Sequence, residues 1–90
     1  MIVTNNPAAT RFELHHDDEL VGFADYHLRD GATVVSHVET FTRYRGRGYA
    51  AVLMAGLLDH LRRDGGTIVP VCSYAVSYLR DNPDQHDLLA

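Results

Sequence analysis

The residues best suited to chemistry lie in one turn, Arg45 to Ala50, which reads Arg-Gly-Arg-Gly-Tyr-Ala. The turn stands between a segment typical of a strand and a long helical pattern, and the first N–H groups of a helix have no partner within it. Together with the helix dipole, such groups attract anions. Glycine lets the backbone approach an anion closely because it has no side chain. The turn therefore predicts a phosphate site, although the same glycines could serve only to enter the helix.

The turn differs from two well-known phosphate-binding loops. No Gly-Lys-Ser or Gly-Lys-Thr follows it, as a Walker loop would require, and the third glycine of a dinucleotide-binding fingerprint is missing. Nucleotide hydrolysis and NAD binding are thus disfavoured.

Three side chains near the turn could take part in proton or group transfer. Glu39 and His37 lie two residues apart on the segment that leads into the turn, so they share one face of a strand. Glu39 could act as a base or orient a substrate, but both side chains could also be solvated on an open strand face. Cys72 follows another predicted strand, where the start of a helix would favour its thiolate form. A lone buried cysteine is otherwise a small apolar side chain.

The elements that must position these residues follow from the hydrophobic patterns. Strands are predicted over Arg11 to His15, Leu20 to Arg29 and Ala32 to Phe41, which are rich in alternating or β-branched and aromatic residues. The Asp30-Gly31 pair predicts a two-residue hairpin between the last two strands. The segment from Met1 to Thr10 contains Asn and Pro residues and is expected to be irregular.

The hairpin also predicts a register. Continued from the Asp30-Gly31 turn, the pairing places Ala24 opposite His37 and Gly22 opposite Glu39. These small residues share a face with the two polar ones and would leave open space beside them.

The second half of the chain predicts a strand between two helices. Apolar residues recur at three- and four-residue spacing from Gly48 to Asp64, which indicates an amphipathic helix. Thr67 to Val71 should form a buried strand, parallel to Ala32 to Phe41 because a helix connects the two. A short helix is expected from Ser73 to about Arg80. The fold class is therefore α/β: one domain over residues 1–90, with a mixed, mostly antiparallel sheet containing one parallel strand pair and covered by two helices.

Composition narrows the class of protein. Ninety residues, of which 46% are hydrophobic and 22% charged, fit one small globular domain, which a ligand or a second subunit in a homodimer would stabilise further. The net charge of −4 and the absence of lysine argue against nucleic-acid binding. A single cysteine excludes an internal disulfide, and the histidines lack the spacing of metal ligands. No apolar run resembles a leader peptide or a membrane span. No metal and no membrane contact are expected, and the predicted location is the cytoplasm.

The chain resembles a known family. The turn matches the Arg/Gln-x-x-Gly-x-Gly/Ala signature of the GNAT acetyltransferase superfamily, and further motifs resemble the small, single-domain GNAT-like proteins over nearly the whole chain. These motifs are His37-x-Glu39, Arg45 to Ala50, Pro70-x-Cys72-Ser73-Tyr74, Asn82-Pro83 and Asp87-Leu88-Leu89. Asn82 and Gln85 depart from the pattern, which usually has His and an aromatic residue at those places.

The resemblance implies an acetyl-CoA-dependent N-acyltransferase that acts on an unidentified amine of a small molecule or a protein. In that family the amides of the turn hold the coenzyme A pyrophosphate, and the preceding strand runs alongside the pantetheine arm. The catalytic candidates are then Glu39, Cys72 and His37. The residues implied in cofactor binding are Thr40, Phe41, Arg45, Gly46, Arg47, Gly48, Tyr49, Ala50, Ser73 and Tyr74.

Two alternatives stay open at this point. The small proteins lack the first helices and last strands that build much of the acceptor site in full-length enzymes, so the chain could be a coenzyme A or acyl-CoA binding module without turnover. It could also be a purely structural interaction domain. Tyr74 and Tyr78 lie four residues apart on one helix face, where they could line an acyl pocket, donate a proton to a departing thiolate or pack in the core.

Overall fold

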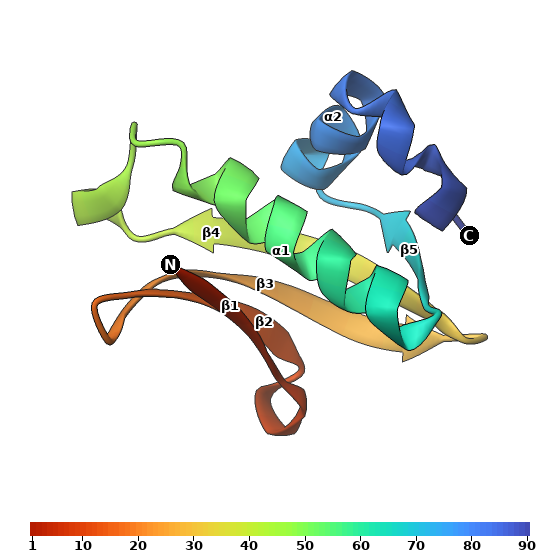
Figure 1. Ribbon diagram of the computed structural model, residues 1–90, viewed down its shortest axis with the longest axis horizontal. Helices are drawn as coiled ribbons and strands as arrows, with labels where there is room; N and C mark the ends of the chain where they lie inside the picture. Colours follow the sequence, from red (N-terminus) through yellow and green to blue (C-terminus); the bar gives the residue numbers. More distant parts are fainter.

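A five-stranded mixed sheet forms the frame of the molecule, and two α-helices pack on it (Figure 1). The computed structural model describes residues 1–90. The strands follow the order β1-β2-β3-β4-β5, antiparallel up to β4 and parallel between β4 and β5. The strands are β1 (Ile2–Asn6), β2 (Arg11–His16), β3 (Glu19–Arg29), β4 (Ala32–Thr40) and β5 (Thr67–Pro70). The helices are α1 (Tyr49–Asp64) and α2 (Ser73–Asp81), with short 3-10 turns at 7–9, 42–44 and 83–88. The predicted α/β class and the single parallel pair are confirmed.

The prediction of an irregular start was wrong for residues 2–6. They form β1, which pairs with β2 along its whole length. Asn6 and Pro7 act at its end, where Asn6 caps a 3-10 turn that begins at Pro7, while the Asn5 side chain accepts a hydrogen bond from the Tyr26 hydroxyl at 2.7 Å. The pairing partner and the helix above supply contacts that a local turn pattern does not reveal.

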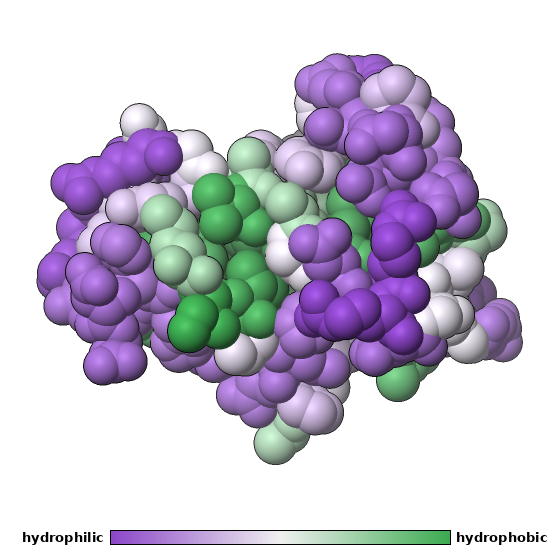
Figure 2. Space-filling view, in the orientation of Figure 1, coloured by the Kyte–Doolittle hydropathy of each residue, from purple (hydrophilic) through white to green (hydrophobic).

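Strand β1 and helix α1 approach each other very closely. A methyl group added at Gly56 of α1 would lie 2.3 Å from a methyl carbon of Val3 in β1. The His60 imidazole Nε2 also lies 2.8 Å from the carbonyl oxygen of Val3. Figure 2 shows an apolar patch in the region where Figure 1 places α1 beside the start of the chain, and Ile2 and Val52 are exposed apolar residues of these two elements.

None of the helices has the length and the apolar composition needed to cross a membrane.

The β3–β4 hairpin turns where the sequence predicts it. Asp30 and Gly31 both have positive φ, as the two-residue turn requires. The predicted register holds near the turn but fails farther along, because β4 contains a bulge beyond Val35. His37 therefore lies opposite Asp25.

The bulge corrects the expected surroundings of the two polar residues of β4. Glu39 lies opposite Phe23, and Ala24 points into the core opposite Val38. Gly22 does not leave open space beside Glu39: a methyl group there would lie 2.6 Å from the carbonyl oxygen of Glu39. Gly22 thus lets the two strands approach closely, and a bulge of this kind is invisible to period-two pairing.

One hydrophobic core joins the sheet to both helices. The periodicity of α1 is confirmed, since its apolar face is buried on the sheet together with Ala75 and Leu79 of α2. Arg62 near the end of α1 holds the C-terminal segment, with two hydrogen bonds to Asp87 (2.7 and 3.1 Å) and one to Gln85 (2.9 Å). The buried members from α1 are Leu53, Met54, Leu57, Leu58 and Leu61.

Strands β4 and β5 pair over only part of their length. Their parallel ladder ends at Val35 and Pro70. The N–H groups of Val71 and Cys72 both donate to the carbonyl oxygen of Val35, at 3.0 and 3.4 Å, and the chain then leaves the sheet to begin α2. Residues 36–40 of β4 consequently have no neighbouring strand on that side (Figure 1).

The contact between Gly56 and Val3 can be tested by stability. Gly56→Ala should lower the free energy of unfolding by about 1–3 kcal/mol, because the new methyl group overpacks the α1–β1 contact. Helix propensity alone would instead raise that free energy by about 1 kcal/mol. Urea unfolding of the single variants and of Gly56→Ala with Val3→Ala gives the measurement. The cost of Gly56→Ala should be smaller in the Val3→Ala background, and equal costs in both backgrounds would contradict the packing described.

Candidate functional site

The turn before α1 presents its backbone to the surface. Gly46 and Gly48 both have φ of +78°, a conformation that favours glycine. A methyl group built on either glycine would meet no atom within 4 Å, so the space in front of the turn is open. Gly48 is the N-cap of α1, and no side chain caps the helix there.

No backbone N–H from Gly46 to Ala51 donates a hydrogen bond within the protein, since the first N–H that bonds back is that of Val52, to Gly48 at 3.4 Å. Consecutive free N–H groups at the start of a sixteen-residue helix can bind an anion, and the helix dipole adds to that attraction. The donors and the open space suit a pyrophosphate. The residues at the predicted position therefore fit the phosphate group of a coenzyme.

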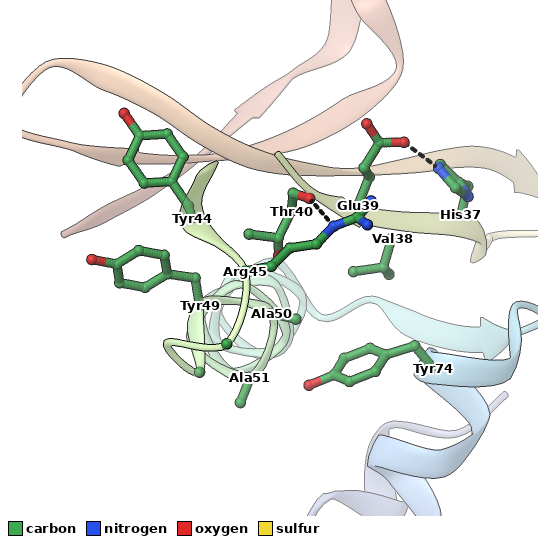
Figure 3. A pocket seen from close by; sticks show the side chains of 12 residues that line it. His37, Val38, Glu39, Thr40, Tyr44, Arg45, Tyr49, Ala50, Ala51 and Tyr74 are labelled. Carbon is green, nitrogen blue, oxygen red and sulfur yellow. Dashed lines mark hydrogen bonds and ion pairs between the residues drawn. The ribbon is translucent and has the colours of Figure 1, made fainter. Parts of the chain in front are cut away.

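A groove of about 410 Å³ continues from this turn along the unpaired edge of β4 (Figure 3). Tyr49 stands on one side of it and Tyr74, from the first turn of α2, on the other. The sequence-predicted site residues that the structure brings together around this groove are His37, Glu39, Thr40, Arg45, Gly46, Gly48, Tyr49, Ala50 and Tyr74. Four predicted residues do not line it: Phe41, Arg47, Cys72 and Ser73.

Three further residues line the groove that the sequence did not single out: Val38, Tyr44 and Ala51. Val38 faces the groove because the bulge in β4 shifts its face, so only the structure reveals it. Ala51 follows Ala50 on the first turn of α1. Its small size and its place next to the predicted anion site could have identified it from the sequence.

Tyr44 is held in place by the start of β3. Its hydroxyl donates a hydrogen bond to the Glu19 carboxylate, which raises the pKa of Tyr44, and Arg43 Nη2 lies 3.3 Å from the same carboxylate. The Tyr44 ring lies 6.2 Å from that of Tyr49. Arg45 Nε donates to the carbonyl oxygen of Thr40 at 3.1 Å, which ties the turn to the end of β4. The hairpin between β2 and β3 thus positions one wall of the groove.

His37 and Glu39 form a hydrogen-bonded pair. Their Nε2 and Oε1 atoms are 3.0 Å apart, and their side chains are 53% and 36% exposed. Both side chains alternate with Val38, which packs against the core, so they point to the opposite face of the sheet from α1. Figure 3 shows the Glu39 carboxylate on the far side of β4 from Tyr49 and Tyr74. Because β4 has no neighbouring strand on the β5 side at this point, the groove and this face meet at its free edge.

Cys72 lies where the sequence predicted the start of a helix. It is the N-cap of α2, and its Sγ accepts a hydrogen bond from the N–H of Ala75 at 3.4 Å. The side chain is half-buried and packs against the core. Its sulfur therefore caps a helix beside the groove rather than lining the groove.

The two tyrosines of α2 share a face, as their spacing predicted, with ring centroids 6.4 Å apart. Burial raises the pKa of both Tyr74 and Tyr78. Tyr74 reaches the groove, whereas Tyr78 packs against the core. Tyr74 thus keeps its phenolic proton at neutral pH and can donate it into the groove.

Histidine and acidic side chains are dispersed. No group of three or more His, Cys, Asp or Glu side chains is arranged to hold a metal ion. His86 Nε2 lies 2.6 Å from the carbonyl oxygen of Leu79. Asn82 donates to the carbonyl oxygen of Tyr78 at 2.8 Å, so this departure from the family pattern serves the end of α2.

Comparison with known proteins agrees with this geometry. The family model for GCN5-related N-acetyltransferases matches residues 11–88. The solution structure of a GCN5-like protein from Staphylococcus aureus has a similar fold, with a TM-score of 0.73 and 17% sequence identity, over 98% of this chain and 86% of that chain. At that identity the likeness concerns the fold alone. None of the curated proteins matches the chain.

The anion site can be tested without disturbing the glycines. Ala51→Glu places a carboxylate in the first turn of α1, where it suits the helix but repels a bound anion. Its affinity for coenzyme A should fall at least about tenfold, equivalent to about 1.4 kcal/mol. Isothermal titration gives the measurement.

Ala55→Glu is the matched control, because it adds the same charge one turn farther along α1 and outside the groove. Coenzyme A should bind this variant within about twofold of the unmodified protein. Equal losses in the two variants, or no loss in Ala51→Glu, would exclude the turn as the anion site.

Proposed function

The chain belongs to the GCN5-related N-acetyltransferase family, and we propose that it transfers an acetyl group from acetyl-CoA to a primary amine. Family and fold support acyl transfer as the general activity. The acetyl-CoA donor and the amine acceptor are proposed, and the row of free N–H groups from Gly46 to Ala51 is the observation that supports the donor.

The groove supports coenzyme A as the carrier. The free N–H groups would hold its pyrophosphate, and the unpaired edge of β4 at residues 36–40 offers backbone groups to an extended arm. Tyr49 and Tyr74 would flank that arm. When bound, acetyl-CoA supplies a thioester whose C–S bond breaks as the amine nitrogen bonds to the acetyl carbon.

Glu39 is the proposed base. An amine that approaches from the face opposite α1 meets its carboxylate at the free edge of β4, where the groove opens. The hydrogen bond from His37 at 3.0 Å orients the carboxylate. Glu39 can accept one amine proton, and Tyr74, which lines the groove and is protonated at neutral pH, can donate a proton to the departing sulfur.

Direct transfer is favoured over an acylated Cys72. The sulfur accepts the N–H of Ala75 and packs against the core, and it does not line the groove. A nucleophilic sulfur would have to leave this position. His37 is accordingly proposed as a positioning residue for Glu39.

A binding module without turnover is the second candidate. The face where the acceptor would lie is not covered by either helix, since both pack on the opposite face. An acceptor site this open holds a substrate less firmly than an enclosed cleft. Affinity for coenzyme A combined with no thiol release across a broad amine panel would favour this candidate.

Glu39→Gln tests the proposed chemistry. It should lower kcat for thiol release by at least about a hundredfold, because general-base catalysis contributes that much, while leaving coenzyme A affinity unchanged. Cys72→Ala should retain kcat within about threefold if the α2 cap tolerates the change, as thermal unfolding of the variant will show. A near-normal rate in Glu39→Gln, or loss of activity in a folded Cys72→Ala, would overturn the assignment of the base.

A further inference from the structure

The face of the sheet turned away from α1, which we call the outer face, carries side chains that the mechanism does not use. Phe23 and Asp25 of β3 alternate with Ala24, which is fully buried in the core shared with the helices. They therefore point to the outer face, as do His37 and Glu39 of β4. Neither helix covers this region.

Phe23 is the centre of an aromatic cluster on the outer face. Its ring centroid lies 6.0 Å from that of His37 and 5.9 Å from that of Phe41. The guanidinium carbon of Arg11 lies 4.9 Å from the same centroid. Phe23 and Phe41 nonetheless stay partly exposed. Apolar surface beside a predicted catalytic carboxylate indicates a place for an apolar part of a substrate.

The carboxylates around this cluster differ in whether an arginine neutralises them. Arg11, which contacts Phe23, is bonded to Glu13 at 2.7 Å, and Asn6 and Arg11 hold the pKa of Glu13 at about 2. Asp25 and Glu39 have no arginine partner within 4.0 Å. Asp25 and Glu39 are diagonal neighbours on β3 and β4, an arrangement in which the Cα atoms lie about 7–8 Å apart. Arg11 already lies over Phe23 and opposite Asp25 in the β2–β3 ladder, so the side of the rings toward Glu39 is the part complementary to a further cation.

We propose that Phe23 and Phe41 form the platform for the acceptor, and that the acceptor is a primary amine with an apolar, preferably aromatic, body. The ammonium group would lie between Glu39 and Asp25, and the apolar body would rest on the two rings. Aromatic rings and paired carboxylates both favour an ammonium ion. The inference rests on the proposed function and assigns its substrate class.

Binding of 2-phenylethylamine tests the platform without requiring turnover. Amide resonances of the isotope-labelled protein saturated with coenzyme A are followed during the titration. Saturable shifts should centre on Phe23 and Phe41, and ethylamine should bind at least about fivefold more weakly because it lacks the aromatic body. Equal affinity for the two amines would refute the platform.

Variants locate the contact. Phe23→Ala should weaken 2-phenylethylamine at least about fivefold and leave ethylamine unchanged, whereas Val69→Ala, on β5 of the same sheet, should change neither. If Phe23→Ala does not fold, Phe23→Leu keeps the apolar volume but removes the ring and should weaken binding about threefold. Equal effects of the substitutions at 23 and 69 would overturn the inference.

A further variant tests the contact between the ammonium group and Asp25. Asp25→Asn should weaken 2-phenylethylamine while leaving the neutral 2-phenylethanol unchanged, and an equal loss for both ligands would contradict the placement of the ammonium.

Failure of the two proposals can be told apart. If coenzyme A binds but 2-phenylethylamine causes no shifts, the acceptor inference fails and the cofactor site stands. If coenzyme A does not bind, the proposed function fails, and the inference that depends on it falls with it.

Discussion

The early end of the β4–β5 ladder is the constraint on which the site depends. After Val35 and Pro70 the two strands part, and the last five residues of β4 keep hydrogen-bonding groups free along one edge. The groove occupies that edge, with the start of α1 at one end and the start of α2 beside it. A continuous ladder would close the groove and would separate it from the outer face. In the proposed function, the parting of the strands provides both a channel for the donor and an opening toward the acceptor.

The local backbone geometry adapts each element to that opening. The bulge in β4 sets Val38 on the core side of the sheet and Glu39 on the opposite face, and both side chains border the groove at the free edge of the strand. Because Gly22 has no side chain, β3 approaches the carbonyl oxygen of Glu39 more closely than any other residue at this position would allow. The two glycines of the turn take left-handed conformations and leave the N–H groups of α1 facing open space. The site is thus built mainly from backbone, and few side chains are required for it.

Features fixed by neighbouring residues could be predicted from the sequence. The periodicity of α1, the hairpin at Asp30-Gly31 and the glycine turn all follow from local chemistry, and each was confirmed as a structural element. Strand β1 was missed because its pairing with β2 and its contact with α1 outweigh its turn-like composition. The bulge was missed because alternation assumes an unbroken ladder. Tyr44 joins the groove through a carboxylate twenty-five residues away in the chain, a contact that no local pattern contains.

The proposed function requires that backbone amides of one turn hold the pyrophosphate of coenzyme A. Amide chemical shifts of the isotope-labelled protein, recorded during titration with coenzyme A and separately with pantetheine, test it most directly. Coenzyme A should shift the amides of residues 46–51 strongly, because they change from free donors to donors bonded to an anion. Pantetheine, which lacks phosphate, should leave those amides nearly unchanged and affect at most residues along β4. Unchanged amides at 46–51 in saturating coenzyme A, or equal shifts with both ligands, would exclude this turn as the pyrophosphate site.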